Sequence, residues 1–459
     1  MKKVICFITA LATTAVILTS CSAEPILNSP IPKQYLPELP EGGKEMIDAD
    51  IVKSTITSTD DGNGNYTNPV IFADVPDIDF IRVDDAYYMV STTMHLSPGC
   101  PVMKSYDLVN WEIVNYVYNT LDDADNLALR NGKHNYGQGQ WAATIRHNNG
   151  IFYVGFLSYA TGKTYIYYTK DIENGKWERF EFDKGFHDMS LLFDDDGKVY
   201  LIYGGGQIRC IELEEDLSAV KPETDRIIIK DAGLVSGCLA EGAHVYKING
   251  YYYIFIITWP PNQRRTQLCY RSKSLDGEWE MKIILDDNID FRNDGVAQGG
   301  IIDDADGNWY CLLFQDHGAV GRAPVLMPMI WEDDWPVVGV DGKAPKTAKI
   351  PFAKQELKSI VTSDEFINSQ IVRPYHSFAE SLEEAGENDY NGSNLALEWQ
   401  WNHNPDNRLW SLTEREGYLR LKTGSVYNTV TEARNTLTQR TFGPECSAYI
   451  KLDTAGMKE

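Results

Sequence analysis

The sequence predicts an all-β protein, a five-bladed β-propeller followed by a second, smaller β-domain. One motif occurs five times: a turn, a variable residue, an aromatic or apolar residue, and a final tyrosine at Tyr88, Tyr153, Tyr200, Tyr253 and Tyr310. Asn-Gly or Asp-Gly dipeptides between apolar runs are strong hairpin signals, and motif periods of this length are typical of propeller blades. No long stretch has the 3.6-residue periodicity of an α/β protein. An irregular β-sandwich with similar hairpins is the alternative.

The N-terminus has the pattern of an export signal. Lys2 and Lys3 precede an apolar run over 4–18, which is shorter than the roughly 20 residues of a membrane-spanning helix. The run ends in Leu-Thr-Ser-Cys21, which resembles the bacterial lipobox. We therefore expect removal of residues 1–20, lipid attachment at Cys21, and an exported protein anchored to the outer membrane on its periplasmic or cell-surface face. A plain secretory signal cleaved near Ala23 is the alternative.

Composition shifts suggest the remaining domain boundaries. Residues 21–67 are rich in Pro, Gly, Asn, Ser and Thr and are interpreted as a tether and lead-in. The propeller is expected over 68–345, and a linker with one helical turn over 346–362. Residues 363–459 alternate apolar and polar side chains, which predicts a β-sandwich. The chain stops at Glu459, so we expect a partial sandwich whose sheet edges are unpaired.

Charge and cysteine content narrow the function classes. The chain has 42 basic and 66 acidic residues, a net charge of −24, which disfavours nucleic-acid binding. Its 26 Tyr, 16 Phe and 11 Trp suit stacking on sugar rings as well as β-cores. Six cysteines beyond Cys21 lack CxxC or zinc-like spacing. We expect them to be buried free thiols, although disulfides remain open: Cys100, Cys210, Cys238, Cys269, Cys311 and Cys446.

The repeat brings acidic residues to equivalent positions. Residues 11 or 12 positions before each final Tyr should lie on the innermost strands, which line the propeller axis: Asp77, Ala142, Asp188, Glu241 and Gln298. Three of these five are acids directed at one small space. Glycoside hydrolysis uses a carboxylic acid and a carboxylate, and a third acid would raise a neighbour's pKa. A wide gap across the axis would leave room for a water molecule and predicts inversion of configuration.

The segments around these acids resemble glycoside hydrolase family 43. The resemblance rests on Asn68-Pro69-Val70, Pro76-Asp77, 105–111, Trp141-Ala142, Asp188 before 190–193, 241–244 and 314–318. It implies that Asp77 is the general base, that Asp188 orients substrate and modulates pKa values, and that Glu241 is the general acid. The sequence departs from the family where Pro is often found beside each acid, at Ile78, Met189 and Ala243.

Further roles follow from the same resemblance. It implies that His317 faces the axis near one calcium ion and that Arg322 contacts substrate hydroxyls. A core histidine and a surface ion pair are the respective alternatives. No organic cofactor is expected. Trp141 and Phe72 are candidates for sugar stacking or core packing, and Gln298 completes the candidate binding set.

The C-terminal region resembles the sandwich appended to members of this family, through 399–406 and 434–440. In that group a sandwich loop caps the pocket and favours cleavage from chain ends. We therefore expect a monomeric, inverting, exo-acting hydrolase that removes β-D-xylose or α-L-arabinofuranose from hemicellulose- or pectin-derived oligosaccharides. A non-catalytic carbohydrate-binding propeller is the alternative, against which the three acids argue. An invertase-like hydrolase would carry Asn-Asp-Pro-Asn and Arg-Asp-Pro segments, and neither is present.

Overall fold

The computed structural model describes residues 3–9, 58–352, 359–368, 386–453 and 455. The chain forms two compact units, one over Ile56–Pro444 and one made of Met1–Thr55 with Glu445–Glu459. The helices among the described residues are short 3-10 turns: η2 (Pro222–Thr224), η3 (Gly318–Val320), η4 (Asn407–Leu409) and η5 (Val430–Glu432). Within this part of the chain, no helix has the length and apolar character needed to cross a membrane.

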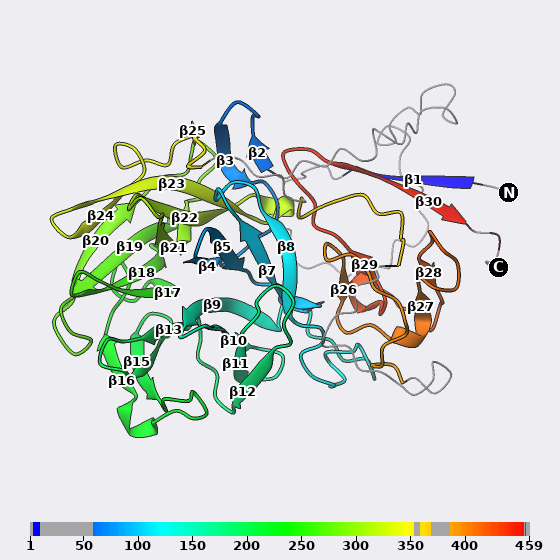
Figure 1. Cartoon of the computed structure of the whole chain (residues 1–459), viewed down its shortest axis with the longest axis horizontal. Helices are drawn as coiled ribbons and strands as arrows, with labels where there is room; N and C mark the ends of the chain where they lie inside the picture. Colours follow the sequence, from blue (N-terminus) through cyan, green and yellow to red (C-terminus); the bar gives the residue numbers. More distant parts are fainter. Residues whose placement is uncertain (1–2, 10–57, 353–358, 369–385, 454, 456–459) are drawn as a thin grey trace. The chain divides into compact units, whose positions relative to one another are not determined.

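Five four-stranded antiparallel sheets form the propeller (Figure 1). The first strands of neighbouring blades pack against one another in a closed ring, β4 to β9, β13, β17, β21 and back to β4. The five-bladed architecture predicted from the repeat is therefore confirmed. The blades are β4 (Asp79–Val83), β5 (Ala86–Val90), β7 (Gly99–Ser105) and β8 (Glu112–Tyr118); β9 (Gln140–Asn148), β10 (Ile151–Ser158), β11 (Lys163–Thr169) and β12 (Glu178–Phe182); β13 (Ser190–Phe193), β14 (Val199–Tyr203), β15 (Ile208–Leu213) and β16 (Arg226–Ile229); β17 (Leu239–Ile248), β18 (Tyr251–Trp259), β19 (Thr266–Ser272) and β20 (Glu280–Leu285); and β21 (Ala297–Asp303), β22 (Trp309–Asp316), β23 (Arg322–Glu332) and β24 (Trp335–Val338).

The repeated motif is the turn between the first and second strand of each blade. Asn149-Gly150 and Asn249-Gly250 have φ values of 51° and 76°, and of 51° and 79°. Two successive positive φ angles are the geometry of the type I′ hairpin turn, which Asn-Gly adopts readily. The final Tyr of each motif therefore lies on the second strand of its blade, next to the first strand, which belongs to the ring around the axis.

A three-stranded sheet lies outside the blades and differs from the expected lead-in and linker. It consists of β2 (Ser58–Asp60), β3 (Asn65–Ile71) and β25 (Thr347–Lys349). The side-chain amide of Asn68 donates to the carbonyl groups of Leu326 and Pro345 at 2.8 Å each. Residues before the first blade are thus tied to the last blade. The sequence of this lead-in has no alternating apolar positions, so it gave no indication of a strand there. The helical turn expected near 355–360 falls largely outside the described residues.

One buried carboxylate joins four blades at the centre of the ring. Asp79, the first residue of β4, is completely buried. It accepts hydrogen bonds from Arg146 Nη1 at 2.7 Å and from the backbone N–H of Ile145 at 2.8 Å, and lies 3.1 Å from His244 Nδ1. Arg146 also donates to Ser190 Oγ at 2.8 Å. Burial raises the pKa of Asp79, but Arg146 and His244 outweigh it and hold that pKa well below its usual range.

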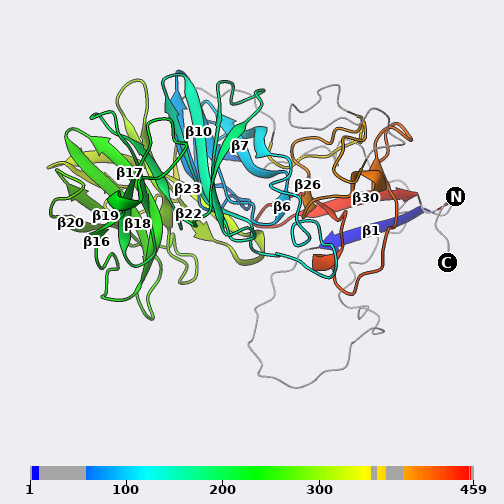
Figure 2. The same ribbon diagram turned by 90° about the horizontal axis from the view of Figure 1, so that it is seen from below.

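The C-terminal part of the larger unit pairs with an insertion in the first blade. Its strands are β26 (Gln400–Asn402), β27 (Trp410–Ser411), β28 (Arg420–Leu421) and β29 (Leu437–Thr438). Strand β26 lies between β29 and β6 (Leu96–Ser97), which precedes β7 in the chain (Figure 2). Ser97 Oγ donates to Asn404 Oδ1 at 2.8 Å. Trp401, Trp410 and Leu412 form a small core of their own.

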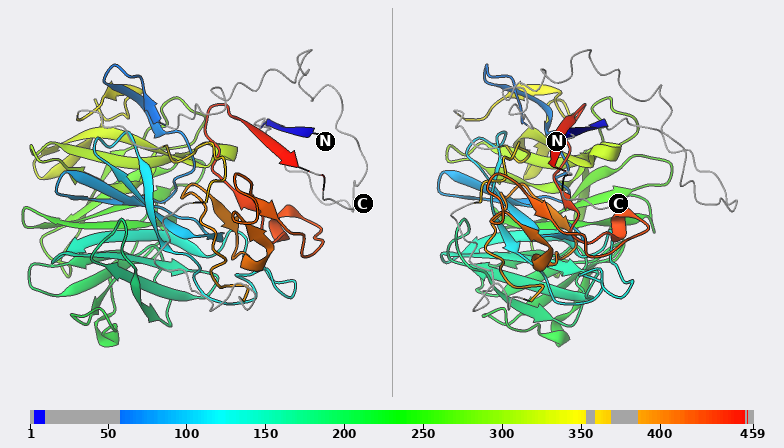
Figure 3. Two further views of the ribbon diagram at one scale, coloured as in Figure 1. Left: turned by 45° about the vertical axis from the view of Figure 1, so that its right-hand side comes forward. Right: turned by 90° about the vertical axis from the view of Figure 1, so that its right-hand side faces the viewer.

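The smaller unit contains one described strand pair. β1 (Lys3–Thr9) pairs antiparallel with β30 (Ser447–Asp453), as Figure 3 shows in blue and red. Removal of residues 1–20, as the export prediction requires, would take away the partner of β30. Cys21, the predicted site of lipid attachment, lies outside the described residues. The six cysteines that follow Cys21 in the chain are free thiols, five of them buried, as expected.

We expect Asp79→Asn to lower the free energy of unfolding by about 3–5 kcal/mol, because the largely buried Arg146 loses its charged partner. The contribution of Asp79 should be present above the unfolded pKa of about 3.9 and lost as pH falls toward its depressed native pKa. Urea unfolding at pH 7 and pH 3 measures both effects. Asp303→Asn is the matched control, because the Arg82–Asp303 pair also joins two blades but is only partly buried, whereas Asp79 is fully buried. Its loss should cost less than about 1 kcal/mol.

Candidate active site

The three predicted acids lie at the same end of the inner strands. Asp77 and Asp188 stand two residues before β4 and β13, with φ values of 51° and 45°. Non-glycine residues rarely adopt this left-handed region, and such strain concentrates at functional sites. Glu241 lies in β17 beside a register shift between Glu241 and His244. A bulge of this kind redirects a side chain, here toward the space between blades.

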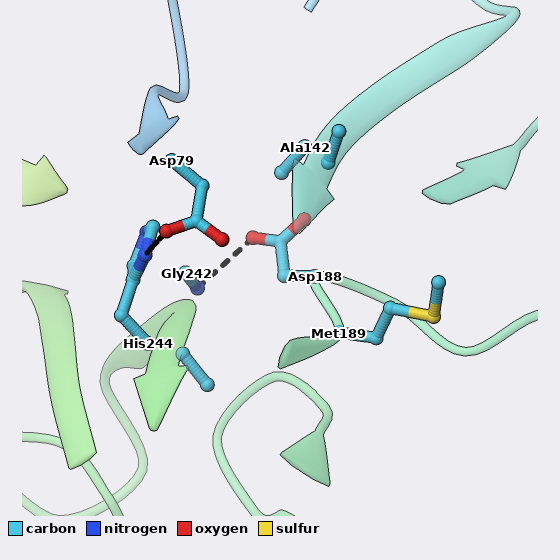
Figure 4. Close-up of a pocket in the computed structure, with 8 residues that line it drawn as sticks. Asp79, Ala142, Asp188, Met189, Gly242 and His244 are labelled. Atoms are coloured by element: carbon cyan, nitrogen blue, oxygen red, sulfur yellow. Dashed lines mark hydrogen bonds and ion pairs between the residues drawn. The ribbon is translucent and has the colours of Figure 1, made fainter. Parts of the chain in front are cut away.

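Asp188 is the buried centre of this group. Its Oδ2 accepts the backbone N–H of Gly242 at 3.0 Å, and its carboxyl group points toward that of Asp79 (Figure 4). A carboxylate oxygen of Asp188 lies within 4.8 Å of one from Glu241. Burial raises the pKa of Asp188 to about 7, and the charges of Glu241 and Asp77 act in the same direction, against His187 and the Gly242 N–H. Asp188 is therefore partly protonated near neutral pH.

A small cavity lies between Asp188 and the structural carboxylate Asp79. Its volume is about 10 Å³, room for a single water molecule. It is lined by Asp79, Ala142, Ala143, Asp188, Met189, Gly242, Ala243 and His244. Of the inner-strand positions predicted from the repeat, Ala142 and Asp188 line this cavity, and Glu241 precedes its lining residue Gly242 in the chain.

Arg322 holds Asp77, and an additional aspartate, Asp316, links Arg322 to a second arginine, Arg265. Arg322 Nη1 donates to Asp77 Oδ1 at 2.5 Å, and Arg322 Nε lies 3.4 Å from Asp316 Oδ1. Asp316 also pairs with Arg265. Burial and the neighbouring Arg322 lower the pKa of Arg265 to about 10, so it stays charged. Arg322 was predicted as a site residue from the sequence. Arg265 and Asp316 were not, because they lie outside the equivalent inner-strand positions.

A histidine missed from the sequence contacts the predicted general acid. His187 Nε2 lies 2.9 Å from Glu241 Oε2, and His187 Nδ1 lies 2.9 Å from the hydroxyl of Tyr159 and 3.4 Å from Asp188 Oδ1. Burial lowers the pKa of His187, but the hydrogen bond to Glu241 and the nearby carboxylates outweigh it, so the pKa lies above its usual value. The available sequence signal was that His187 directly precedes Asp188.

The predicted binding residues occupy different surroundings. Trp141 is half-buried, donates to the carbonyl of Gly137 at 3.2 Å, and its ring lies 4.6 Å from that of Tyr159. Gln298 is buried, has a φ of 67°, and packs its side chain against Gly242. Phe72 packs against Gly443, whose N–H donates to the Phe72 carbonyl at 2.7 Å. Phe72 is thus partly covered by the C-terminal region, whereas Trp141 and Gln298 adjoin the acids.

His317 lies between aromatic rings rather than among oxygen ligands. Its ring stacks on Phe291 at 4.2 Å and meets Phe72 edge-on at 4.8 Å, while Nε2 bonds Gln315 Oε1 at 3.0 Å. Burial and the nearby Arg292 lower the pKa of His317 to about 4, so the ring is neutral. Calcium takes six to eight oxygen ligands, and of these neighbours only Gln315 carries a side-chain oxygen, so the prediction requires water molecules as most of the ligands. The calcium ion stays a prediction, and no catalytic step depends on it.

One group among the described residues has the ligand spacing of a metal site. His187, Asp188 and Glu241 place one ligand atom each within 4.8 Å of one another. The hydrogen bond between His187 and Glu241, together with the raised pKa of Asp188, accounts for their proximity through shared protons. No metal is needed to hold these three side chains together.

Two family models match the chain. Residues 66–336 match the glycosyl hydrolases family 43 model, and residues 387–459 match the β-xylosidase C-terminal concanavalin A-like domain. A β-xylosidase of Formosa agariphila is 31% identical over 87% of this chain and 72% of its own length. The non-reducing end α-L-arabinofuranosidase BoGH43B of Bacteroides ovatus is 28% identical over 84% of this chain and 70% of its own.

Solved structures show the same architecture. The bifunctional GH43-CE protein of Bacteroides eggerthii is 46% identical, with a TM-score of 0.74 over 82% of this chain. The match spans only 46% of that longer protein. The GH43 protein BlXynB of Bacillus licheniformis is 26% identical, with a TM-score of 0.67 over 83% of this chain and 72% of its own.

We expect Gly242→Ala to lower turnover of an aryl glycoside at least tenfold. Gly242 has a φ of 68°, and an added Cβ would lie 2.8 Å from the Gln298 side chain, so the N–H that binds Asp188 must shift. Unfolding free energy should fall by only about 1–2 kcal/mol. Gly250→Ala is the control, since its φ is 79° but a Cβ there meets open space. Equal activity of the two variants would contradict the assigned role of Gly242.

Proposed function

The chain belongs to glycosyl hydrolase family 43, and on that basis we propose an inverting exo-glycosidase that releases β-D-xylose or α-L-arabinofuranose. The substrates are terminal pentosyl groups of hemicellulose- or pectin-derived oligosaccharides. The observation that carries the proposal is the grouping of Asp77, Asp188 and Glu241 at one end of the inner strands, with Asp188 and Glu241 carboxylates within 4.8 Å.

The chemistry requires one proton donor and one proton acceptor. We assign Glu241 as the donor to the glycosidic oxygen as the C–O bond breaks. We assign Asp77 as the acceptor of a proton from the water that forms the new bond at the anomeric carbon. Arg322 holds Asp77 Oδ1, so Oδ2 is the oxygen assigned to this water. After one cycle Asp77 has gained a proton and Glu241 has lost one, and exchange with solvent restores both.

Asp188 controls the protonation of its neighbour rather than reacting. Two carboxylates within 4.8 Å in a buried setting resist simultaneous ionisation. A proton is therefore partly retained on Asp188 near neutral pH, where an ordinary Asp would be ionised. We assign Asp188 the role of a neighbour that responds to the charge on Glu241 without reacting itself.

Exo action is supported by the position of the C-terminal region. Arg440 Nε donates to the carbonyl of Asp74 at 2.8 Å, and Gly443 binds the carbonyl of Phe72. These contacts fix the segment that leads into Asp77 and place sandwich residues on one side of it. C-terminal residues on one side of Asp77 would block a polysaccharide chain from extending past the site in that direction.

The relatives named as β-xylosidase and as α-L-arabinofuranosidase support both pentoses. We propose that one chain is sufficient as a monomer, because all three acids come from it. We also propose export and lipid attachment at Cys21, which rest on the sequence alone. Assays on p-nitrophenyl β-D-xylopyranoside and α-L-arabinofuranoside distinguish the two specificities.

The first-formed sugar should have inverted anomeric configuration, because a general base at Asp77 directs water to the face opposite the leaving group. Proton NMR during the first minutes of hydrolysis, before mutarotation, measures it. Asp77→Ala should be inactive, and no glycosyl-enzyme should accumulate. Retained configuration would instead make Asp77 a nucleophile and overturn its assigned role.

Glu241→Gln should lower kcat on an oligosaccharide by about 10²–10⁴-fold, because a poor leaving group requires protonation. Hydrolysis of a dinitrophenyl glycoside should fall far less, since that group leaves without a proton. Substrate binding, measured by calorimetry, should be nearly unchanged. More than a tenth of the wild-type rate on the oligosaccharide would exclude Glu241 as the acid.

A further inference from the structure

His187 is the titratable side chain in direct contact with Glu241, and the chemistry assigned above does not use it. Its Nε2 lies 2.9 Å from Glu241 Oε2, a hydrogen-bond distance. The titratable groups around the ring are Glu241 from β17, Asp188 from its own segment, Tyr159 following β10, and Asp77 preceding β4. Three of these four are carboxyl groups, which favour a protonated ring.

The ring is fixed from several directions. Tyr159 bonds Nδ1 at 2.9 Å, and the carbonyl of His187 accepts the N–H of Gly204 at 2.9 Å. A Cβ at Gly205 would lie 3.4 Å from His187 Cδ2, so the glycine-rich turn before β15 packs closely on the ring. The side chain is 24% exposed. It therefore reaches solvent while remaining held against the carboxyl group of Glu241.

A hydrogen bond between imidazole and carboxyl groups has two forms that contain one proton. Either Glu241 is a carboxylic acid that donates to a neutral ring, or a protonated ring donates to a carboxylate. Only the first form can protonate a leaving group. The second form stores the same proton one hydrogen bond away.

We propose that His187 is a positioning residue that orients the Glu241 carboxyl group and shares its proton, so that Glu241 regains its proton between turnovers. This inference rests on the proposed function. In each cycle Glu241 Oε2 gives its proton to the leaving oxygen and becomes a carboxylate. The neutral ring then takes a proton from solvent, and the Nε2–H of the resulting imidazolium transfers to Oε2, while Asp77 releases its proton to solvent.

Two substitutions separate orientation from proton sharing. A Gln amide reaches the position of Nε2 and can keep the bond to Glu241, but it has no titrating proton. A shorter Asn reaches only the position of Nδ1 and keeps the Tyr159 side. We expect His187→Asn to lower kcat on an oligosaccharide at least tenfold while leaving kcat on a dinitrophenyl glycoside within about threefold. His147→Gln, at an exposed histidine on β9, should change neither rate.

The pH profile reports the shared proton. In the wild-type protein the alkaline limb of kcat/KM follows the last proton of the pair, which leaves at a higher pH than it would from Glu241 beside a neutral partner. In His187→Gln the imidazole is no longer present to hold the proton, so the alkaline limb of kcat/KM should move to lower pH. The expected shift is about one unit or more, because ordinary His and Glu pKa values differ by roughly two units. An unmoved limb, together with equal losses on both substrates in His187→Asn, would reduce His187 to a structural role.

Direct titration keeps the inference separate from the proposed function. NMR of protein labelled at histidine Cε1, with the His187 signal identified by its loss in His187→Gln, should show titration above pH 6.5. In Glu241→Gln the same signal should titrate at lower pH, because the hydrogen bond and charge that favour protonation are removed. Wild-type protein inactive on all glycosides would refute the proposed function alone. An equal His187 pKa in both proteins would refute proton sharing, whatever the activity.

Discussion

The ionised, fully buried Asp79 is the constraint on which the rest of the propeller depends. A charge can be buried only where partners surround it, and this one is surrounded by groups from different blades. Arg146 extends the network to Ser190 in the third blade and to the carbonyl of Val245 in the fourth. The angular order of the blades is therefore fixed at the axis by directional bonds, in addition to apolar packing between the sheets.

The same centre positions the reactive groups. Asp77 stands two residues before Asp79, and Glu241 stands three before His244. Any displacement of Asp79 and its partners would therefore shift Asp77 and Glu241 together. Asp188 faces Asp79 across a cavity with room for one water, so two neighbouring carboxyl groups differ in their tendency to ionise. Cationic partners keep Asp79 ionised, whereas burial beside other carboxylates raises the pKa of Asp188.

The five blades and the positions of the three acids could be predicted from the sequence, because both follow from a repeated motif. Equivalent positions relative to a hairpin tyrosine translate directly into equivalent positions around an axis, as Asp188 and Glu241 illustrate. Contacts that depend on side-chain reach between blades have no such register. Arg265, which precedes β19, contacts Asp316 at the end of β22, and no local pattern links the two. The outer sheet of β2, β3 and β25 was missed for a related reason, since β25 has three residues and pairs with β3, which is far away in the chain.

Local charge compensation reconciles a strongly acidic chain with a site for a neutral sugar. Four carboxyl groups meet there, Asp77, Asp188, Glu241 and Asp316, yet two arginines neutralise two of them through direct ion pairs. Burial and like charges favour a proton on Asp188, and the fourth carboxyl group, that of Glu241, faces the protonatable His187. Such a balance gives an uncharged pentosyl group no electrostatic penalty on entry. It also means that the protonation state of one small group of side chains, rather than the net charge of −24, determines whether the site can donate a proton.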